Sequence, residues 1–284
     1  MTRLIGTLML LVAVTAAQAH PGVGIVQDSR GNIFFTDLRQ VWKVAPDGRK
    51  SVAVPDVHSH ELCLDADDNL YGEHLSGEGG KWRHRVWRLT RDGSLSDVIP
   101  ARDGFLRDDS FVRDKAGNRY WTEAGGPAKI LKRSTDGRIT TLATADLRAI
   151  GRMTVTADGT LFLIASGNLH RVTPDGKVML VAARLSEHSP PPAEVAELNY
   201  HMGIWSDAAG NAYVAVARER LVLQVRPDGS KKVAARSGDG WSPSGGMFDR
   251  DGNLWLLEYD AANAVRIRRT SPPGSERVIL ASDP

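Results

Sequence analysis

A short turn motif occurs six times along the chain and limits the fold more than any other feature of the sequence. Its first copy is Asp28-Ser-Arg-Gly-Asn-Ile-Phe34, and the other five begin at Asp65, Asp114, Thr156, Asp207 and Asp249. Gly followed by Asn supplies the positive φ angles that a tight turn requires, and short alternating apolar runs flank each copy. Each copy therefore predicts a tight turn between two antiparallel strands.

A second tight turn follows the first in every unit. Its copies are centred on Asp47-Gly48, Asp92-Gly93, Asp136-Gly137, Asp175-Gly176, Asp228-Gly229 and, in altered form, Pro273-Gly274. Two tight turns join three strands, and the apolar run after the second turn supplies a fourth. Four strands at a spacing of 37 to 51 residues, repeated six times, predict an all-β fold, a six-bladed β-propeller of four-stranded antiparallel blades.

Residues 1–19 are predicted to be a signal peptide rather than part of the fold. Arg3 precedes an apolar stretch from Leu4 to Ala17, and Ala17-Gln18-Ala19 has the pattern of a cleavage site. The apolar stretch is too short to span a bilayer, and no later stretch is long enough, so no membrane span is predicted. We expect cleavage after Ala19 and a periplasmic or secreted protein.

The propeller is predicted to occupy residues 20–284 as one domain. Its blades are expected at about 20–56, 57–101, 102–145, 146–185, 198–237 and 241–284. The single cysteine, Cys63, excludes an internal disulfide bond. A net charge of +2, with basic residues scattered over the blades, gives no reason to expect a nucleic-acid partner.

Variation in length is confined to the connections opposite the tight turns, so one face of the propeller carries longer loops. Two insertions are prominent there, at residues 75–85 and 184–200. They are interpreted either as flaps over the channel mouth or as tolerated surface insertions. Because rigid scaffolds place function on such loops, we expect a small-molecule ligand at this mouth, with a protein partner on the looped face as the alternative.

Polar residues gather where the innermost strand of a blade opens and where the second strand closes. The candidate ligands of a divalent metal are His58, His60, His74, Asp109 and Glu123. The candidate catalytic residues are His60, Asp109, Glu123, Arg152 and His201. Nitrogen and oxygen ligands favour Zn, Mn, Ca or Mg, and no organic cofactor is implied. The alternative is a water-filled channel whose polar lining has no catalytic role.

The repeat unit, hydrophobic-Asp-x-x-Gly-Asn-hydrophobic-aromatic, resembles that of the NHL-repeat and SMP-30/gluconolactonase-like six-bladed propellers, and the resemblance covers residues 20–284. In gluconolactonase-like enzymes, Glu, Asn and Asp hold a divalent cation where the innermost strands open. At the matching positions this chain has Asp109, with His60 as a substitute ligand, and Val23-Gly24 replaces the Glu-Gly-Pro of the first blade. The resemblance implies a metal-dependent hydrolase of a lactone or ester.

A second, partial resemblance is to the virginiamycin B lyases. The run Tyr120-Trp121-Thr122-Glu123 is similar to their Trp-Phe-Thr-Glu strand, and their His before the innermost strand is matched by His60, in a different blade. Three functions therefore stay open: a metal-dependent hydrolase, a lyase with His60 or His201 as base, and a non-catalytic NHL-type propeller that binds a ligand or protein. The cluster of histidines in blade 2 favours the hydrolase.

Overall fold

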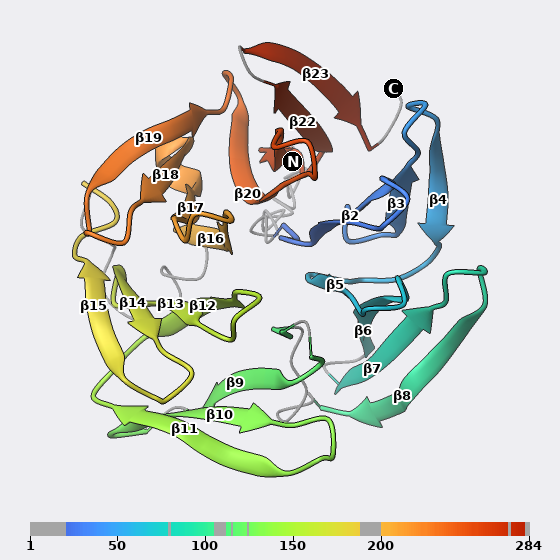
Figure 1. Ribbon diagram of the computed structural model, residues 1–284. Helices are drawn as coiled ribbons and strands as arrows, with labels where there is room; N and C mark the ends of the chain where they lie inside the picture. The colour runs from blue at the N-terminus through green and yellow to red at the C-terminus, as the bar shows by residue number, and fades with distance from the viewer. Residues whose placement is uncertain are drawn as a thin grey trace, which may run out of the picture.

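Six antiparallel sheets are arranged around a common centre in the computed structural model, as Figure 1 shows. The structure describes residues 21–78, 81–104, 112–114, 116–123, 125–187, 200–271 and 274–281. The predicted six-bladed propeller is confirmed. The predicted signal peptide lies outside the described residues.

Within each blade the strands follow one another from the channel outward. Blade 1 holds β1 (Ile25–Gln27), β2 (Ile33–Thr36), β3 (Val41–Val44) and β4 (Lys50–Val54). Blade 2 holds β5 (Leu62–Leu64), β6 (Leu70–Glu78), β7 (Lys81–Leu89) and β8 (Leu95–Asp103). Blade 3 shows β9 (Arg119–Glu123), β10 (Ala128–Arg133) and β11 (Ile139–Ala145), and an isolated bridge pairs Arg113 with Arg119 on its inner side.

The second half of the ring repeats this order with four strands in every blade. Blade 4 holds β12 (Ile150–Val155), β13 (Leu161–Ala165), β14 (Asn168–Val172) and β15 (Val178–Ala182). Blade 5 holds β16 (His201–Ser206), β17 (Ala212–Val216), β18 (Leu221–Val225) and β19 (Lys231–Arg236), with a turn of 3-10 helix, η1 (Ala217–Glu219). Blade 6 holds β20 (Trp241–Phe248), β21 (Leu254–Asp260), β22 (Val265–Ser271) and β23 (Ser275–Leu280). Among the described residues, no helix has the length and apolar character needed to cross a membrane.

The repeated Asp fixes both the tight turn and the strand that follows it. In blade 5, Asp207 Oδ1 accepts hydrogen bonds from the backbone N–H groups of Ala209 (3.0 Å) and Asn211 (2.9 Å). Its Oδ2 accepts from the Asn211 side chain (2.7 Å) and from the Tyr213 hydroxyl (2.9 Å). The same bond from Asp to an aromatic side chain recurs at Asp65–Tyr71, Asp114–Tyr120 and Asp249–Trp255. In these four copies the bond explains why an Asp is paired with Tyr or Trp six positions later, whereas the other two copies have Phe there.

The hydrophobic core lies between neighbouring blades rather than at one centre. Between blades 1 and 6, Ile25 and Phe35 pack with Trp255 and Leu257. Each of these two blades is built from one continuous segment, so the ring closes by packing, without exchange of a strand. The inner strands come close here, since a Cβ added at Gly245 would lie 2.3 Å from the carbonyl oxygen of Val23.

The insertion at residues 75–85 forms strand rather than the expected loop. Strands β6 and β7 stay paired as far as Glu78 and Lys81, so the insertion extends the blade 2 hairpin beyond the sheet. In the other insertion, residues 188–199 lie outside the described residues.

We predict that Asp207→Ala lowers the free energy of unfolding by about 2–4 kcal/mol, because it leaves several turn donors and the Tyr213 hydroxyl without their acceptor. Asp228→Ala, in the second turn of the same blade, is the control and should have a smaller effect, since Asp228 accepts from the backbone N–H of Ser230 on the exposed surface. Urea unfolding measures both. Equal losses for the two variants would contradict this role of the repeated Asp.

Candidate functional site

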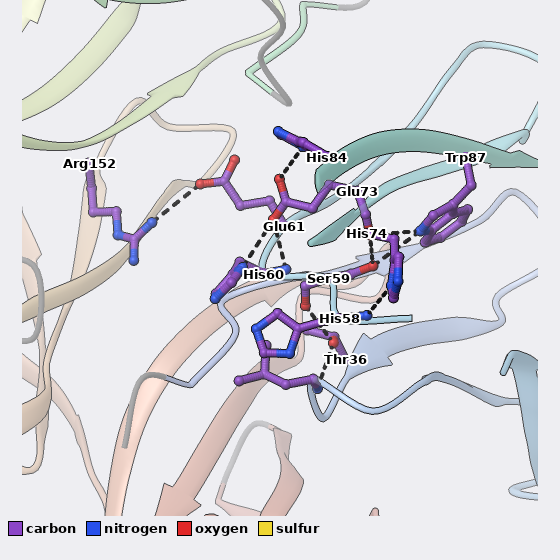
Figure 2. A network of polar contacts seen from close by, with 11 residues as sticks. Thr36, His58, Ser59, His60, Glu61, Glu73, His74, His84, Trp87 and Arg152 are labelled. Carbon is purple, nitrogen blue, oxygen red and sulfur yellow. Dashed lines mark hydrogen bonds and ion pairs between the residues drawn. The ribbon is translucent and has the colours of Figure 1, made fainter. Parts of the chain in front are cut away.

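The segment before β5, which carries His58 to Glu61, is held in place by buried hydrogen bonds. Ser59 is fully buried, and its carbonyl oxygen accepts a hydrogen bond from Thr36 Oγ1 of blade 1 (2.7 Å). Its hydroxyl donates to the backbone carbonyl of Glu73, which also accepts from Trp87 Nε1 (2.8 Å). Figure 2 shows these contacts between blades 1 and 2. These hydrogen bonds fix His58 and His60, which flank Ser59, on the looped side of the channel.

Glu73 forms the centre of a polar cluster with two histidines (Figure 2). Its Oε1 accepts a hydrogen bond from the backbone N–H of His60 (2.9 Å) and lies 3.2 Å from His60 Nδ1. Its Oε2 lies 3.7 Å from His84 Nε2. Burial alone would raise the pKa of Glu73, but the hydrogen bonds from His60 and the nearby ring of His84 lower it to about 2. Glu73 is therefore a carboxylate at neutral pH.

This carboxylate determines how the His60 ring can act. With Nδ1 as the donor to Glu73, Nε2 is the nitrogen that would accept a proton from a bound molecule. A carboxylate in this position also stabilises the imidazolium that forms when the ring takes up a proton. The His60 side chain is 21% exposed. Blade 2 thus presents a carboxylate–histidine pair of the kind used in general base catalysis.

Three other predicted residues lie around this pair. His74 Nδ1 accepts a hydrogen bond from the backbone N–H of His58 (2.9 Å). The His58 ring meets the His60 ring edge-on, with centroids 4.8 Å apart. Arg152 of blade 4 reaches Glu61, with 3.3 Å between Nη1 and Oε1. The structure thus brings His58, His60, His74 and Arg152 to one region of the channel (Figure 2).

The remaining predicted residues lie apart from this cluster or outside the described residues. Glu123 is exposed at the end of β9. Asp109 lies outside the described residues, so its predicted role stays a prediction. His201 is buried at the start of β16, and neither ring nitrogen has a hydrogen-bond partner among the described residues. Burial lowers the pKa of His201 to about 4, so the ring is neutral at pH 7.

The described side chains do not fit a resident metal ion. Nowhere in the described ranges do three or more His, Cys, Asp or Glu side chains come together so that they could hold one. Both carboxylate oxygens of Glu73 face histidines, and His74 Nδ1 already accepts a backbone N–H. The metal ligands predicted from the sequence include Asp109, which lies outside the described residues, so that set of ligands stays a prediction. The geometry that is described fits acid–base chemistry instead.

Next to the cluster, the channel contains a cavity of about 250 Å³. We call it the channel pocket. Its charged lining is Glu61, Arg113 and Arg152. Apart from Thr154 and the glycines, the rest is largely apolar, including Met153, Met202, Trp205, Val23, Ile25 and Leu62. Burial raises the pKa of Glu61, and the charge of Arg152 opposes that shift. Glu61, which lines the pocket, directly follows His60 in the chain, whereas His60 and Glu73 are not among the lining residues.

A larger cavity, of about 770 Å³, lies between the outer strands β18 and β19 of blade 5 and residues 184–187, which follow blade 4. Its walls include Leu221, Leu223, Lys231 and Val233. None of the residues predicted from the sequence to act in catalysis or metal binding lines it. The chemistry of the side chains, rather than the size of the cavity, therefore locates the candidate site.

Sequence reasoning missed Glu73, His84 and Arg113 as site residues. The position nine residues after the repeated Asp is that of His74. Neighbouring residues of a strand point to opposite faces, and it is the side chain of Glu73 that contacts the His60 ring. The position of His84 follows from its pairing with Leu75 in the extended hairpin. The polar and apolar residues of β7 do not alternate regularly, so the sequence contains no clear signal of that pairing.

Comparisons with known proteins support the fold. No protein-family model matches the chain, and no curated protein matches it. The structure is similar to that of virginiamycin B lyase from Staphylococcus aureus, at 14% identity and a TM-score of 0.55, over 95% of this chain and 87% of that one. It is also similar to a putative gluconolactonase, at 15% identity and a TM-score of 0.56, over 91% of this chain and 88% of that one. The likeness is one of fold.

A third similar structure is a calcium-binding protein, regucalcin, from Agrobacterium tumefaciens. Its identity is 17% and its TM-score 0.56, over 84% of this chain and 82% of that one. The resemblance to gluconolactonase-like propellers that the repeats indicated is thus confirmed in the architecture. At these identities the catalytic residues of the three proteins do not carry over to this chain, so its site has to be argued from its own side chains.

We predict that His201 makes the protein less stable as the pH falls from about 6.5 to about 4. In the unfolded chain the ring takes up a proton near its ordinary pKa, whereas in the folded state it stays neutral until about pH 4. The loss over this range should approach about 3 kcal/mol, and His201→Leu should remove most of it. His170→Leu, at a half-buried position, should remove less. Urea unfolding at pH 7 and pH 4.5 measures the difference, and an unchanged pH dependence in His201→Leu would contradict the assignment.

Proposed function

We propose that this chain is an exported propeller enzyme that hydrolyses a small ester or lactone at the channel mouth, with His60 as general base. The observation that carries the proposal is the contact between Glu73 and His60 Nδ1 (3.2 Å) beside the channel pocket. Export rests on the predicted signal peptide. The similarity in fold to a putative gluconolactonase supports the reaction class.

The proposed chemistry needs one proton acceptor and one orienting anion. His60 Nε2 takes a proton from a water molecule as the water oxygen attacks the carbonyl carbon of the substrate. Glu73 keeps Nδ1–H directed toward itself and stabilises the imidazolium. When the tetrahedral intermediate collapses, the C–O bond to the leaving alkoxide breaks and His60 returns the proton to that oxygen. The products are a carboxylic acid and an alcohol, or a hydroxy acid from a lactone.

Neighbouring side chains assist this pair. His84 lies 3.7 Å from the second oxygen of Glu73 and helps to keep that carboxylate ionised. Arg152, whose predicted role was to stabilise negative charge, lines the pocket and is available to bind substrate there. Since the described donors do not fit a metal ion, none of these steps uses one. Asp109, which the sequence predicts as a metal ligand, would act in an alternative mechanism that uses a divalent cation.

A lyase is the second candidate function, and the same histidine pair favours it. A base held by a carboxylate can also remove a proton from an activated carbon atom. The similarity in fold to a virginiamycin B lyase adds support for elimination. Product analysis separates the two reactions, because hydrolysis adds water across the broken bond and elimination leaves a double bond. A non-catalytic binding propeller would give neither product.

The central test of the proposal is mutation of the pair. Against a panel of small aryl esters and lactones, His60→Asn should lower kcat/KM by about 10²–10⁴-fold, the usual contribution of a general base. Glu73→Gln should lower kcat by about 10²-fold or more, because the amide holds the ring less well and does not stabilise the imidazolium. His170→Asn, on β14, is the control and should retain full activity. Wild-type rates in both pair variants would rule out His60 as the base.

Removal of divalent cations gives an independent test. We expect the purified mature protein to retain its His60-dependent turnover after dialysis against a chelator, because the described donors act as acid and base without a bound ion. Elemental analysis before and after dialysis checks that any cation has been removed. Activity that is lost on chelation and restored by Zn, Mn, Ca or Mg would contradict this mechanism and support the alternative that uses Asp109.

A further inference from the structure

The channel pocket carries more positive than negative charge. Two guanidinium groups, those of Arg113 and Arg152, line it together with one carboxylate, that of Glu61. Arg152 contacts Glu61 through Nη1, and its buried Nε has no hydrogen-bond partner among the described residues. Arg113 stacks over the Tyr71 ring at 4.9 Å, but its buried Nε and Nη2 have no hydrogen-bond partner there either.

Unpaired buried donors of this kind are unfavourable, and Arg268 shows how a buried guanidinium of this protein is satisfied. Arg268 donates from all three nitrogens, to Glu258, to Glu276 and to the backbone carbonyl of Arg236. Its neighbour Arg266 donates to Glu258 (2.8 Å). A buried charged group without a partner costs free energy, so proteins usually pair it or supply a ligand. Arg113 and Arg152 line the channel pocket with Glu61 as the one carboxylate, which contacts Arg152, and a bound anion would supply acceptors for the remaining donors of both arginines.

Single unpaired Nε atoms also occur at Arg88, Arg171 and Arg269. Those arginines lie outside the channel pocket. Arg113 differs from them because two of its nitrogens lack partners and because it faces a cavity together with a second guanidinium. The location and the charge of the two arginines together point to a ligand.

We propose that the substrate of this site is a small ester or lactone that carries a carboxylate, and that Arg113 and Arg152 bind this carboxylate in the channel pocket. This inference rests on the proposed function, because it places the reacting carbonyl at His60. Guanidinium groups bind carboxylates through charge-assisted hydrogen bonds. The apolar side chains of Met153, Met202 and Trp205 would contact the body of the substrate. A volume of about 250 Å³ suits a molecule of this size.

Binding and turnover are measured separately with matched probes. Succinate is the binding probe, and monomethyl succinate and dimethyl succinate are the substrates with and without a carboxylate. Succinate should raise the Tm of the wild-type protein at constant ionic strength. Arg113→Gln and Arg152→Gln should each weaken succinate binding about 10- to 100-fold, the range expected for loss of a charge-assisted hydrogen bond. Arg148→Gln, whose side chain is 84% exposed, should bind succinate like the wild type.

Stability and catalysis provide the controls. Arg113→Gln should leave the unliganded protein as stable as the wild type or more so, because it removes unpaired buried donors. The wild type should prefer monomethyl over dimethyl succinate by at least 10-fold in kcat/KM, and Arg113→Gln should abolish this preference. His60→Asn should bind succinate normally while it loses turnover.

The outcomes distinguish the inference from the proposed function. Succinate binding that depends on both arginines, in a protein without esterase or lactonase activity, would support the anion site and contradict the hydrolase. Turnover of neutral and anionic esters at equal rates, with no effect of succinate on any variant, would overturn the inference and leave the hydrolase standing. Succinate binding that is unchanged in both arginine variants would also overturn it.

Discussion

The hydrogen bonds of the repeated Asp are the interaction on which the propeller depends. Each carboxylate accepts from the backbone of its own turn and, in four blades, from an aromatic side chain of the next strand. One charged group therefore fixes the turn and places the ring that packs between blades. The looped face opposite is free to vary, because the strands are held from the other end. Because the turns on one face fix the strands, polar side chains can gather at the channel mouth on the opposite face without weakening the hydrophobic core.

At that mouth, a second buried carboxylate organises the candidate site. Glu73 receives hydrogen bonds from the His60 backbone and ring, and the lower pKa that results keeps it charged. Its own backbone carbonyl is held by Ser59 and Trp87. The base proposed for catalysis is thus positioned by the same contacts that join blades 1 and 2. The two arginines of the channel pocket are the complement, since they face it with a single carboxylate, that of Glu61.

The fold could be predicted because its signals are local. Turn residues such as Asp207 and Gly210 act within a few positions of each other, and counting them gives the number of blades. The site could be predicted only in part. His60 was found from its position five residues before the repeated Asp. Glu73 was not selected, because its role depends on which face of β6 it occupies. Arg113 comes directly before the third Asp, a position that was not compared between the blades. The extended hairpin was missed because the glycine-rich run Gly77-Glu-Gly-Gly80 was interpreted as part of a loop.

A crystal structure of His60→Asn soaked with monomethyl succinate tests the central claim most directly. The account predicts that the ester carbonyl lies within hydrogen-bond distance of residue 60 and that the carboxylate contacts Arg113 and Arg152 in the channel pocket. The same ligand seated in the outer cavity between blades 4 and 5, with the channel pocket filled by water, would contradict the claim that the residues around His60 form the site of reaction.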